Sequence, residues 1–283
     1  MVAYTLLSNH IPLQTELIGA NEHESHFVFD IWYNNTSSID PTIITGDMHS
    51  INKANFALMH WFEGELRPRF SNLKRELNNI FSSKEPCNYK SFLVQPAGQI
   101  NKELICKEKE AIDQVIVTLG LKEMNQSTLI RKLCSLPPQN TTRRAIFEFD
   151  KLIRSIYTLK CILDPEILIN SHRSQNRVES YHNLRASISS VGGRKSLIGN
   201  TDLEIEISNQ CGRLIANVII YYNAFLLSRL LEKNIGSSKK KLKMLKKISP
   251  VAWQHIHFMG HYIFYEKRAK IDIEEIVGKI EFI

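Results

Sequence analysis

The chain has few of the sequence signals that mark cofactor or metal chemistry. Its five cysteines are an odd number, lie far apart and include no C-x-x-C pair. They therefore predict neither a disulfide framework nor a zinc cluster, and they indicate a reducing compartment. The patterns G-x-x-x-x-G-K-[ST] and G-x-G-x-x-G, whose backbone cradles phosphates, are also absent. Their absence argues against nucleoside triphosphate or dinucleotide cofactors.

Long hydrophobic runs are equally scarce. The most apolar run is Leu214–Leu227, which lies between Arg213 and Arg229 and is interrupted by Asn217 and Asn223. A run this short and this polar is not expected to cross a bilayer, so it predicts a buried helix. No signal peptide is recognised at the beginning of the sequence, and we expect no membrane association.

The sequence does contain an excess of positive charge. Its 36 Lys and Arg residues against 29 Asp and Glu residues give a net charge of +7 and a pI near 9.1, which favours a polyanionic partner. Lysines are concentrated in Lys239–Ile248, which is interpreted equally well as an exposed linker or helix and as a patch that contacts phosphates.

The first part of the chain predicts an α/β sheet with mixed strand directions. Two apolar segments predict a hairpin, a helix follows, and a short β-branched run then predicts a strand that is covered on both faces. A helix capped by Asn52 or Ser50 comes next. In order, the strands and first helix are expected at Val2–Ser8, Gln14–Ala20, Glu22–Asn34 (capped by Asn21), Thr42–Thr45 and Leu66–Phe70.

The rest of the chain is predicted to be helical. Apolar residues at helical spacing indicate helices over Lys102–Leu119, Asn125–Leu136 and Thr141–Leu163, and another helix begins near Pro165. The predicted domains are therefore a partial α/β region at 1–75, a helical insertion at 76–163, and a region at 164–283 made of a further helix and the C-terminal helices. The pair Arg143 and Arg144 is most simply a solvated face, with DNA contact as the alternative.

Two carboxylates are the candidate site. Asp47 directly follows the predicted strand Thr42–Thr45, at the sheet edge where ligands and catalytic groups gather, although it could simply cap the next helix. Glu179 lies in a polar, basic helical stretch that also contains Arg173, Asn176 and Arg177. Carboxylates from separate elements can hold two Mg²⁺ ions for phosphoryl transfer, so Asp47 and Glu179 are candidate metal ligands and catalytic residues.

Six segments, in this order along the chain, resemble the catalytic region of the Tn-three family of replicative transposases. Single segments would be unspecific, but six in the family's order over nearly the whole chain make a strong match. They are GDMHS at Gly46–Ser50, FALxH at Phe56–His60, PRFSNL at Pro68–Leu73, LIRKLCSLPPQNT at Leu129–Thr141, QNRVE at Gln175–Glu179 and SPVAWQHI at Ser249–Ile256.

The resemblance implies a fold, a reaction and partners. The fold is RNase H-like with a helical insertion, and here it is incomplete at its N-terminus. The site is a D-D-E carboxylate triad in which Asp47 matches the second Asp and Glu179 the Glu, with Mg²⁺ as cofactor. The implied reaction is cleavage at the 3′ ends of a transposon followed by strand transfer. The implied partners are the transposon ends and target DNA, bound by a homo-oligomer in the bacterial cytoplasm.

The sequence also departs from the family pattern. No residue before Asp47 lies in a motif that matches the first catalytic Asp, so we expect this chain alone not to cleave DNA. If it does cleave DNA, Asp30 or Asp40 would complete the site. Ser50 and Val178 stand where the family tends to have glycine. The alternative function is an inactive, DNA-binding or oligomerising remnant of the transposase.

Basic residues near the two carboxylates are the candidate DNA contacts. We expect Arg67, Arg69, Arg173 and Arg177 to bind phosphates, and Asn176 to hold the ligand helix or the substrate. Arg69 has an alternative role of equal weight, which is to pair with Glu65 at a strand end.

Overall fold

The computed structural model describes residues 1–193, 197–233, 239–263 and 272–280. The chain is mostly helical with a few short strands, which confirms the coarse prediction of a mostly helical α/β protein. It divides into two compact units. The first comprises residues 1–6 and 13–176, and the second comprises residues 7–12 and 177–283.

A β-hairpin begins the chain, as predicted. Strand β1 (Val2–Ser8) pairs with β2 (Ile11–Ile18) through the two-residue connection of Asn9 and His10, which have φ angles of 46° and 76°. Two successive left-handed residues match the twist of the flanking strands. Pro12 therefore lies inside β2, near its beginning, and not in the connection.

The single helix expected over Glu22–Asn34 is instead two shorter elements. A 3₁₀ turn, η1 (Glu24–His26), precedes helix α1 (Val28–Tyr33). The ring nitrogen Nδ1 of His23 accepts a hydrogen bond from the Ser25 amide, so His23 and not Asn21 caps the first turn. Helix α1 then buries Val28, Phe29, Asp30 and Ile31.

Strands β3 (Ile43–Ile44) and β4 (Glu65–Leu66) form a parallel pair. The strands of the described residues form three separate two-stranded sheets, and not the one sheet that the sequence predicts. The strand expected over Thr42–Thr45 is two residues long and has β4 as its one ladder partner in the described part of the chain. Ile44 is buried but Ile43 is 44% exposed, so the prediction that both faces are covered is wrong.

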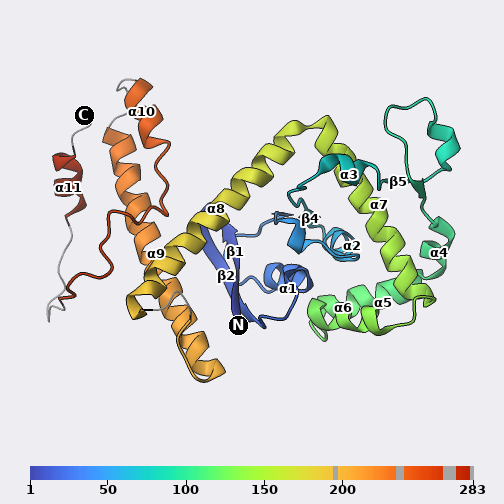
Figure 1. The fold of residues 1–283 in the computed structure, drawn as a ribbon, viewed down its shortest axis with the longest axis horizontal. Helices are drawn as coiled ribbons and strands as arrows, with labels where there is room; N and C mark the ends of the chain where they lie inside the picture. The colour runs from blue at the N-terminus through green and yellow to red at the C-terminus, as the bar shows by residue number, and fades with distance from the viewer. Residues whose placement is uncertain (194–196, 234–238, 264–271, 281–283) are drawn as a thin grey trace. The chain divides into compact units, whose positions relative to one another are not determined.

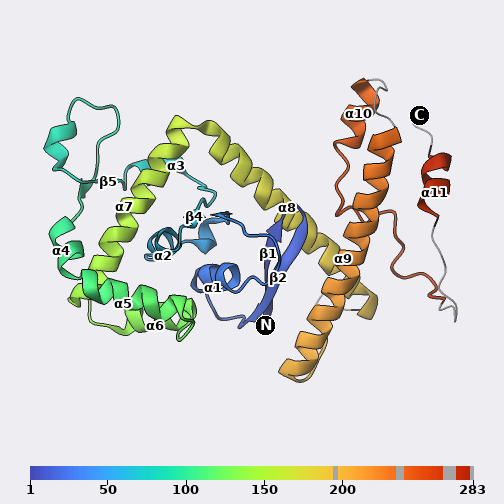
Figure 2. The same cartoon turned by 180° about the vertical axis from the view of Figure 1, so that it is seen from behind.

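Helix α7 packs against several other elements of the first unit. It packs against α2, and Figures 1 and 2 show α5 and α6 near its amino-terminal end and α3 near its other end. The core beneath it includes the buried side chains of Phe56, Met59, Ile146 and Tyr157. The elements are η2 (Met48–Ser50), α2 (Asn55–Trp61), α3 (Leu73–Leu77), β5 (Phe81–Ser82), η3 (Pro86–Tyr89), β6 (Gly98–Gln99), α4 (Lys102–Lys107), α5 (Lys109–Gly120), α6 (Gln126–Ser135) and α7 (Thr141–Leu163).

The long helices after residue 120 agree with the sequence prediction. Asn125 caps α6 by accepting a hydrogen bond from the Thr128 amide, and α7 has the predicted bounds. The helix expected over Lys102–Leu119 is split at Glu108 into α4 and α5. Helix α8 (Pro165–Ser189) begins with the predicted proline. Its residues up to Asn176 belong to the first unit and the remainder to the second.

Helix α9 (Asp202–Lys233) dominates the second unit. Its buried residues include Ala216, Ile219 and Ile220, but Val218 and Tyr221 are exposed. The prediction of a buried helix over Leu214–Leu227 is therefore wrong for most of its surface, because one face alone packs against the rest of the unit. By length and composition alone, α9 is also apolar enough to cross a membrane. The other elements are η4 (Ser190–Gly192), α10 (Lys239–Leu245) and α11 (Ile273–Lys279).

Candidate functional site

The chain places Asp47 at the end of the parallel pair. The amides of Arg67 and Arg69 donate hydrogen bonds to the carbonyls of Ile44 (2.8 Å) and Gly46 (2.7 Å). These bonds continue the ladder to the residue just before Asp47. The predicted position of Asp47, just past the carboxyl end of a strand, is confirmed, because β3 ends at Ile44.

Asp47 also caps the turn that follows it. Its Oδ1 accepts a hydrogen bond from the His49 amide at 2.8 Å, and its carbonyl accepts one from Ser50 Oγ at 2.6 Å. A Cβ added at Gly46 would come within 2.6 Å of that Ser50 hydroxyl, so the turn requires glycine there. The start of α2 has its own acceptor, because Asn52 Oδ1 accepts hydrogen bonds from the amides of Ala54, just before the helix, and Asn55, its first residue. Among the described residues, Asp47 Oδ2 has no hydrogen-bond partner and can accept a ligand.

Negative charge gathers around Tyr4, close to Asp47. Burial raises the pKa of the Tyr4 hydroxyl, and the charges of Glu24, Asp47 and Glu16 raise it further. Carboxylates in one region attract a cation. Within the described part of the chain, however, no group of three Asp, Glu, His or Cys side chains is arranged to hold one metal ion. The described residues do not by themselves complete a metal site.

The second candidate ligand lies in the other unit. Glu179 is exposed on α8, in the part of that helix that belongs to the second unit. Arg177 reaches Asn9 Oδ1 at 3.4 Å, at the tip of the hairpin. Burial lowers the pKa of His10, and the charge of Arg177 lowers it further. A common cleft for Asp47 and Glu179 stays a prediction.

The two arginines that follow β4, Arg67 and Arg69, have different roles. Arg67 donates a hydrogen bond to Glu65 at 2.6 Å, and Lys160 pairs with the same carboxylate at 2.9 Å. Burial tends to raise the pKa of Glu65, but these two hydrogen bonds outweigh it and hold the pKa below its ordinary value. The expected pairing of Arg69 with Glu65 is therefore wrong, because Arg67 occupies that carboxylate. Arg69 is exposed and has no ion pair among the described residues.

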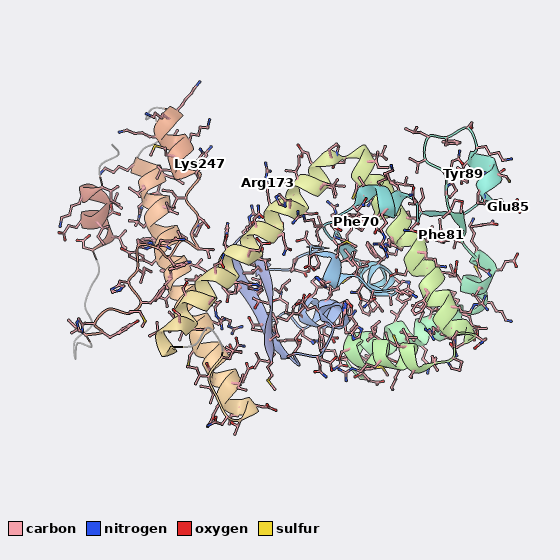
Figure 3. The ribbon with its side chains drawn as sticks, in the orientation of Figure 1. Phe70, Phe81, Glu85, Tyr89, Arg173 and Lys247 are labelled. Carbon is pink, nitrogen blue, oxygen red and sulfur yellow. The ribbon has the colours of Figure 1, made fainter. Side chains whose placement is uncertain are left out.

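The remaining predicted contacts lie on α8. Arg173 is exposed (Figure 3), and its guanidinium approaches Asn170 Oδ1 at 3.4 Å. Asn176 is also exposed, one turn before Glu179 in the sequence. The roles of these side chains on DNA stay predictions.

Asp30 and Asp40 are not equivalent as substitutes for a missing carboxylate. Asp30 is buried, and its two oxygens accept hydrogen bonds from the amides of Gln126 (2.6 Å) and Ser127 (3.1 Å). The Asp30 carboxylate thus caps the amino-terminal end of α6, although the two lie far apart in the sequence. Burial raises the pKa of Asp30 despite these hydrogen bonds. Asp40 lies exposed in the connection between α1 and β3.

Comparisons with known proteins place the chain in a family. The family model described as Tn3 transposase DDE domain matches residues 1–262. The transposase for transposon Tn1546 of Enterococcus faecium is 22% identical over 257 residues, which cover 90% of this chain and 25% of that protein. The transposase for transposon Tn501 of Pseudomonas aeruginosa is 22% identical over 268 residues, which cover 94% of this chain and 27% of that protein.

A third relative gives the same result. The transposase for transposon Tn21 of Escherichia coli is 22% identical over 271 residues, which cover 95% of this chain and 27% of that protein. The chain thus spans about a quarter of the length of these curated relatives. No solved structure matches the chain. Because the family model covers more than half of its residues, the chain belongs to the Tn3 transposase DDE domain family.

Proposed function

We propose that this chain forms part of the catalytic centre of a Tn3-type transposase that cleaves the 3′ ends of a transposon and transfers them to target DNA. One observation carries the proposal. Asp47 follows the parallel β3–β4 pair and has one carboxylate oxygen without a hydrogen-bond partner among the described residues, in a chain whose residues 1–262 match the family's DDE domain. The chain's role is therefore to supply carboxylates and DNA contacts.

The proposed fold of the α/β part is RNase H-like. Its support is the order hairpin, α1, β3, α2, β4, with β3 and β4 parallel. Parallel neighbours need a crossover element between them, and α2 is that element here. The α/β core would then hold Asp47 on a rigid scaffold, while the helices around α7 form the inserted region.

Asp47 and Glu179 are proposed as two of the three carboxylates of a D-D-E triad. Their hard oxygens suit Mg²⁺, which when bound activates an attacking oxygen and stabilises the leaving one. Because the described residues do not complete a metal site, the third carboxylate is proposed to come from another segment, in cis or in trans. Positioned charge supplies most of the acceleration in phosphoryl transfer, so a chain without that group should be inactive alone.

DNA is the proposed partner, in the bacterial cytoplasm. The net charge of +7 favours phosphate binding that is independent of sequence. Arg69 and Arg173 are the best of the four predicted arginine contacts, because both are exposed. Arg67 is the weakest, because it is engaged with Glu65. No nucleotide cofactor is proposed.

A homo-oligomer is proposed through α9. Six exposed residues of this helix follow one another at alternating spacings of four and three, which is the seam of a two-stranded coiled coil. We call them the α9 seam: Ile207, Cys211, Leu214, Val218, Tyr221 and Phe225. Their exposed fractions reach 64% at Leu214 and 71% at Tyr221, so a second copy could bury them.

The direction of pairing follows from charge. Parallel pairing would bring Asp202, Glu204 and Glu206 of one copy next to the same three carboxylates of the other. Like charges across such a seam cost free energy, and antiparallel pairing avoids them. The proposed partner of the α9 seam is therefore an antiparallel second copy of this chain.

A cleavage assay tests the proposed catalytic role. The substrate is a duplex with transposon ends, incubated with Mg²⁺ or Mn²⁺ and with this chain alone or joined to the upstream part of a relative. We expect the joined protein to nick the duplex and this chain alone not to do so. Nicking should be lost in the Asp47→Ala and Glu179→Ala variants of the joined protein. Glu110→Ala, which removes an exposed carboxylate of α5, is the matched control and should stay active. Nicking by Asp47→Ala at the control's rate would overturn the triad assignment, and salt-sensitive DNA binding without nicking would favour the inactive remnant.

A further inference from the structure

A second basic site lies in the first unit, apart from Asp47. A groove with a volume of about 550 Å³ runs between α3 and α7 beside the turn that leads into α2. Five cationic side chains line it, and neither Asp47 nor any of the predicted DNA-contact arginines does. They are Lys53 in that turn, Arg75 on α3, and Arg144, Lys151 and Arg154 on α7. We call it the α3–α7 groove.

The carboxylates in the α3–α7 groove neutralise two of these five cations. Glu76 pairs with Arg154, and Glu148 pairs with Lys151 at 2.7 Å. The third carboxylate, Asp150, is buried and turned toward α2, where its Oδ1 accepts hydrogen bonds from the Phe56 and Ala57 amides. Each carboxylate is therefore already engaged within the protein.

Among the residues that the structure describes, three of the five cations have no acidic partner. Within the described residues, no carboxylate lies within 4.0 Å of the charged nitrogens of Lys53, Arg75 or Arg144. Arg75 and Arg144 are exposed, as is Lys53. The arrangement leaves uncompensated positive charge that converges on one groove from three separate segments, which is what a multivalent anion requires.

Aromatic rings hold two of the cations in place. The Nζ of Lys53 lies 5.9 Å from the centre of the Phe147 ring, and the Nζ of Lys151 lies 4.8 Å from the centre of the Phe81 ring. Figure 3 shows Phe81 beside α7, and the Phe81 amide donates a hydrogen bond of 2.9 Å to Ser155 Oγ of that helix. A ring orients an ammonium group without cancelling its charge, so the cation remains able to bind phosphate.

We infer that the α3–α7 groove binds the phosphodiester backbone of DNA, as a contact separate from the candidate catalytic site. The inference rests on the proposed function, which supplies DNA as the polyanion. Lys53, Arg75 and Arg144 contact phosphates, and the paired Lys151 and Arg154 contribute to the field around them. Such contacts position a duplex and carry no sequence information.

DNA-binding measurements on the whole chain test this inference. The variant Arg75→Ala/Arg144→Ala removes two exposed cations of the groove. The matched control Lys84→Ala/Lys90→Ala removes two exposed cations in the connection before β6, so the net charge falls by the same amount. Fluorescence anisotropy with unrelated short duplexes over a series of salt concentrations gives the affinity and its salt dependence.

The expected result is specific to the groove. Each lost phosphate contact should lower the magnitude of the slope of log K against log salt by about 0.9, so this slope should be nearly 2 smaller in the groove variant. The groove variant should also bind every duplex roughly tenfold or more weakly than the unmodified protein. The control should keep the slope of the unmodified protein. Arg75→Lys/Arg144→Lys keeps both charges and should retain most of the affinity. Equal slopes and affinities for the groove variant and the control would overturn the inference.

The outcomes also separate this inference from the proposed function. Salt-sensitive binding by the unmodified chain with no effect of the groove variant would overturn the groove alone. No DNA binding by the unmodified chain would overturn the DNA role of the chain and the groove together. Inorganic phosphate is the remaining arm. If phosphate raises the Tm of the unmodified protein but not of the groove variant, and DNA binding is unaffected by the substitutions, the groove is a free-phosphate site and the DNA inference is wrong.

Discussion

Asp150 on α7 accepts a hydrogen bond of 2.8 Å from the amide of Phe56, in the first turn of α2. A second bond of 3.1 Å comes from the Ala57 amide, so one carboxylate satisfies two of the unpaired amides at that helix terminus. The residues are far apart in sequence, and this contact joins the α/β part of the first unit to its longest inner helix. Burial raises the pKa of Asp150 to about 7, although the two amides and Arg154 act in the opposite direction.

The first prediction follows from the raised pKa of Asp150. An unfolded chain releases this proton near pH 3.8, whereas the folded protein keeps it up to about pH 7. The contribution of Asp150 to stability is therefore fully present below pH 3.8 and is lost as the pH rises through about 7. The free energy of unfolding of the protein should therefore fall by at most about 1.4 kcal/mol per pH unit between pH 3.8 and about pH 7.

Asp150→Asn is the variant that isolates this effect. An asparagine oxygen can still accept from the amides of α2 but does not titrate. Urea unfolding at about pH 5 and about pH 8 should show a smaller loss of stability in Asp150→Asn than in the unmodified protein. The same loss in both proteins would show that Asp150 does not titrate in this range.

The second prediction concerns the buried carboxylate of Asp30. Asp30→Ala should lower the free energy of unfolding by about 1–3 kcal/mol, because it leaves the buried amides of Gln126 and Ser127 without an acceptor. Asp40→Ala, at an exposed position, should change it by less than about 0.5 kcal/mol. Urea unfolding measures both variants. Equal stability of the two would contradict the capping role of Asp30.

The structure explains why such contacts escaped sequence reasoning. The hairpin, α6, α7 and the start of α8 were predictable because periodicity, caps and proline are local signals. Asp150, Gln126 and Asp30 act across long stretches of sequence: the Gln126 side chain accepts from the Phe29 amide at 2.7 Å, 97 residues away. No local pattern encodes such a pairing. The sequence predicts one larger sheet because a β-branched run indicates a buried strand but does not indicate how many strands pair with it.

The candidate site likewise has features that the sequence predicts and features that it does not. The place of Asp47 after a strand was predictable from the strand's composition and its flanking Pro41 and Gly46. The partner of Glu65 was not predictable, because Arg67 and Arg69 are both basic and both lie close after Glu65 in the sequence. Lys53 and Arg75 carried no signal at all, since the α3–α7 groove exists only after three segments pack together.

The third prediction distinguishes the roles of Arg67 and Arg69, the two arginines that follow β4. Arg69→Ala should weaken binding to unrelated duplexes and lower the salt slope by about 0.9, because this exposed side chain is free to contact a phosphate. Arg67→Ala should leave DNA affinity nearly unchanged and instead lower stability by up to about 1 kcal/mol, since its partner Glu65 is partly exposed. Anisotropy and urea unfolding of both variants give the comparison. A larger loss of DNA affinity in Arg67→Ala than in Arg69→Ala would reverse the assignment.

The last prediction concerns the α9 seam. Leu214→Glu/Val218→Glu places charges at two central seam positions and should convert an oligomer to a monomer in sedimentation, because buried like charges oppose pairing. Ile169→Glu changes an isoleucine of α8 that is 48% exposed, and it should leave the oligomer intact. In the antiparallel pair Cys211 does not face its own copy, so oxidation should yield as much cross-linked dimer in Cys211→Ser as in the unmodified protein. Loss of cross-linking in Cys211→Ser would indicate parallel pairing. A monomeric unmodified chain that floats with phospholipid vesicles would instead show that the apolar surface of α9 meets a membrane, and the proposed pairing would then be wrong.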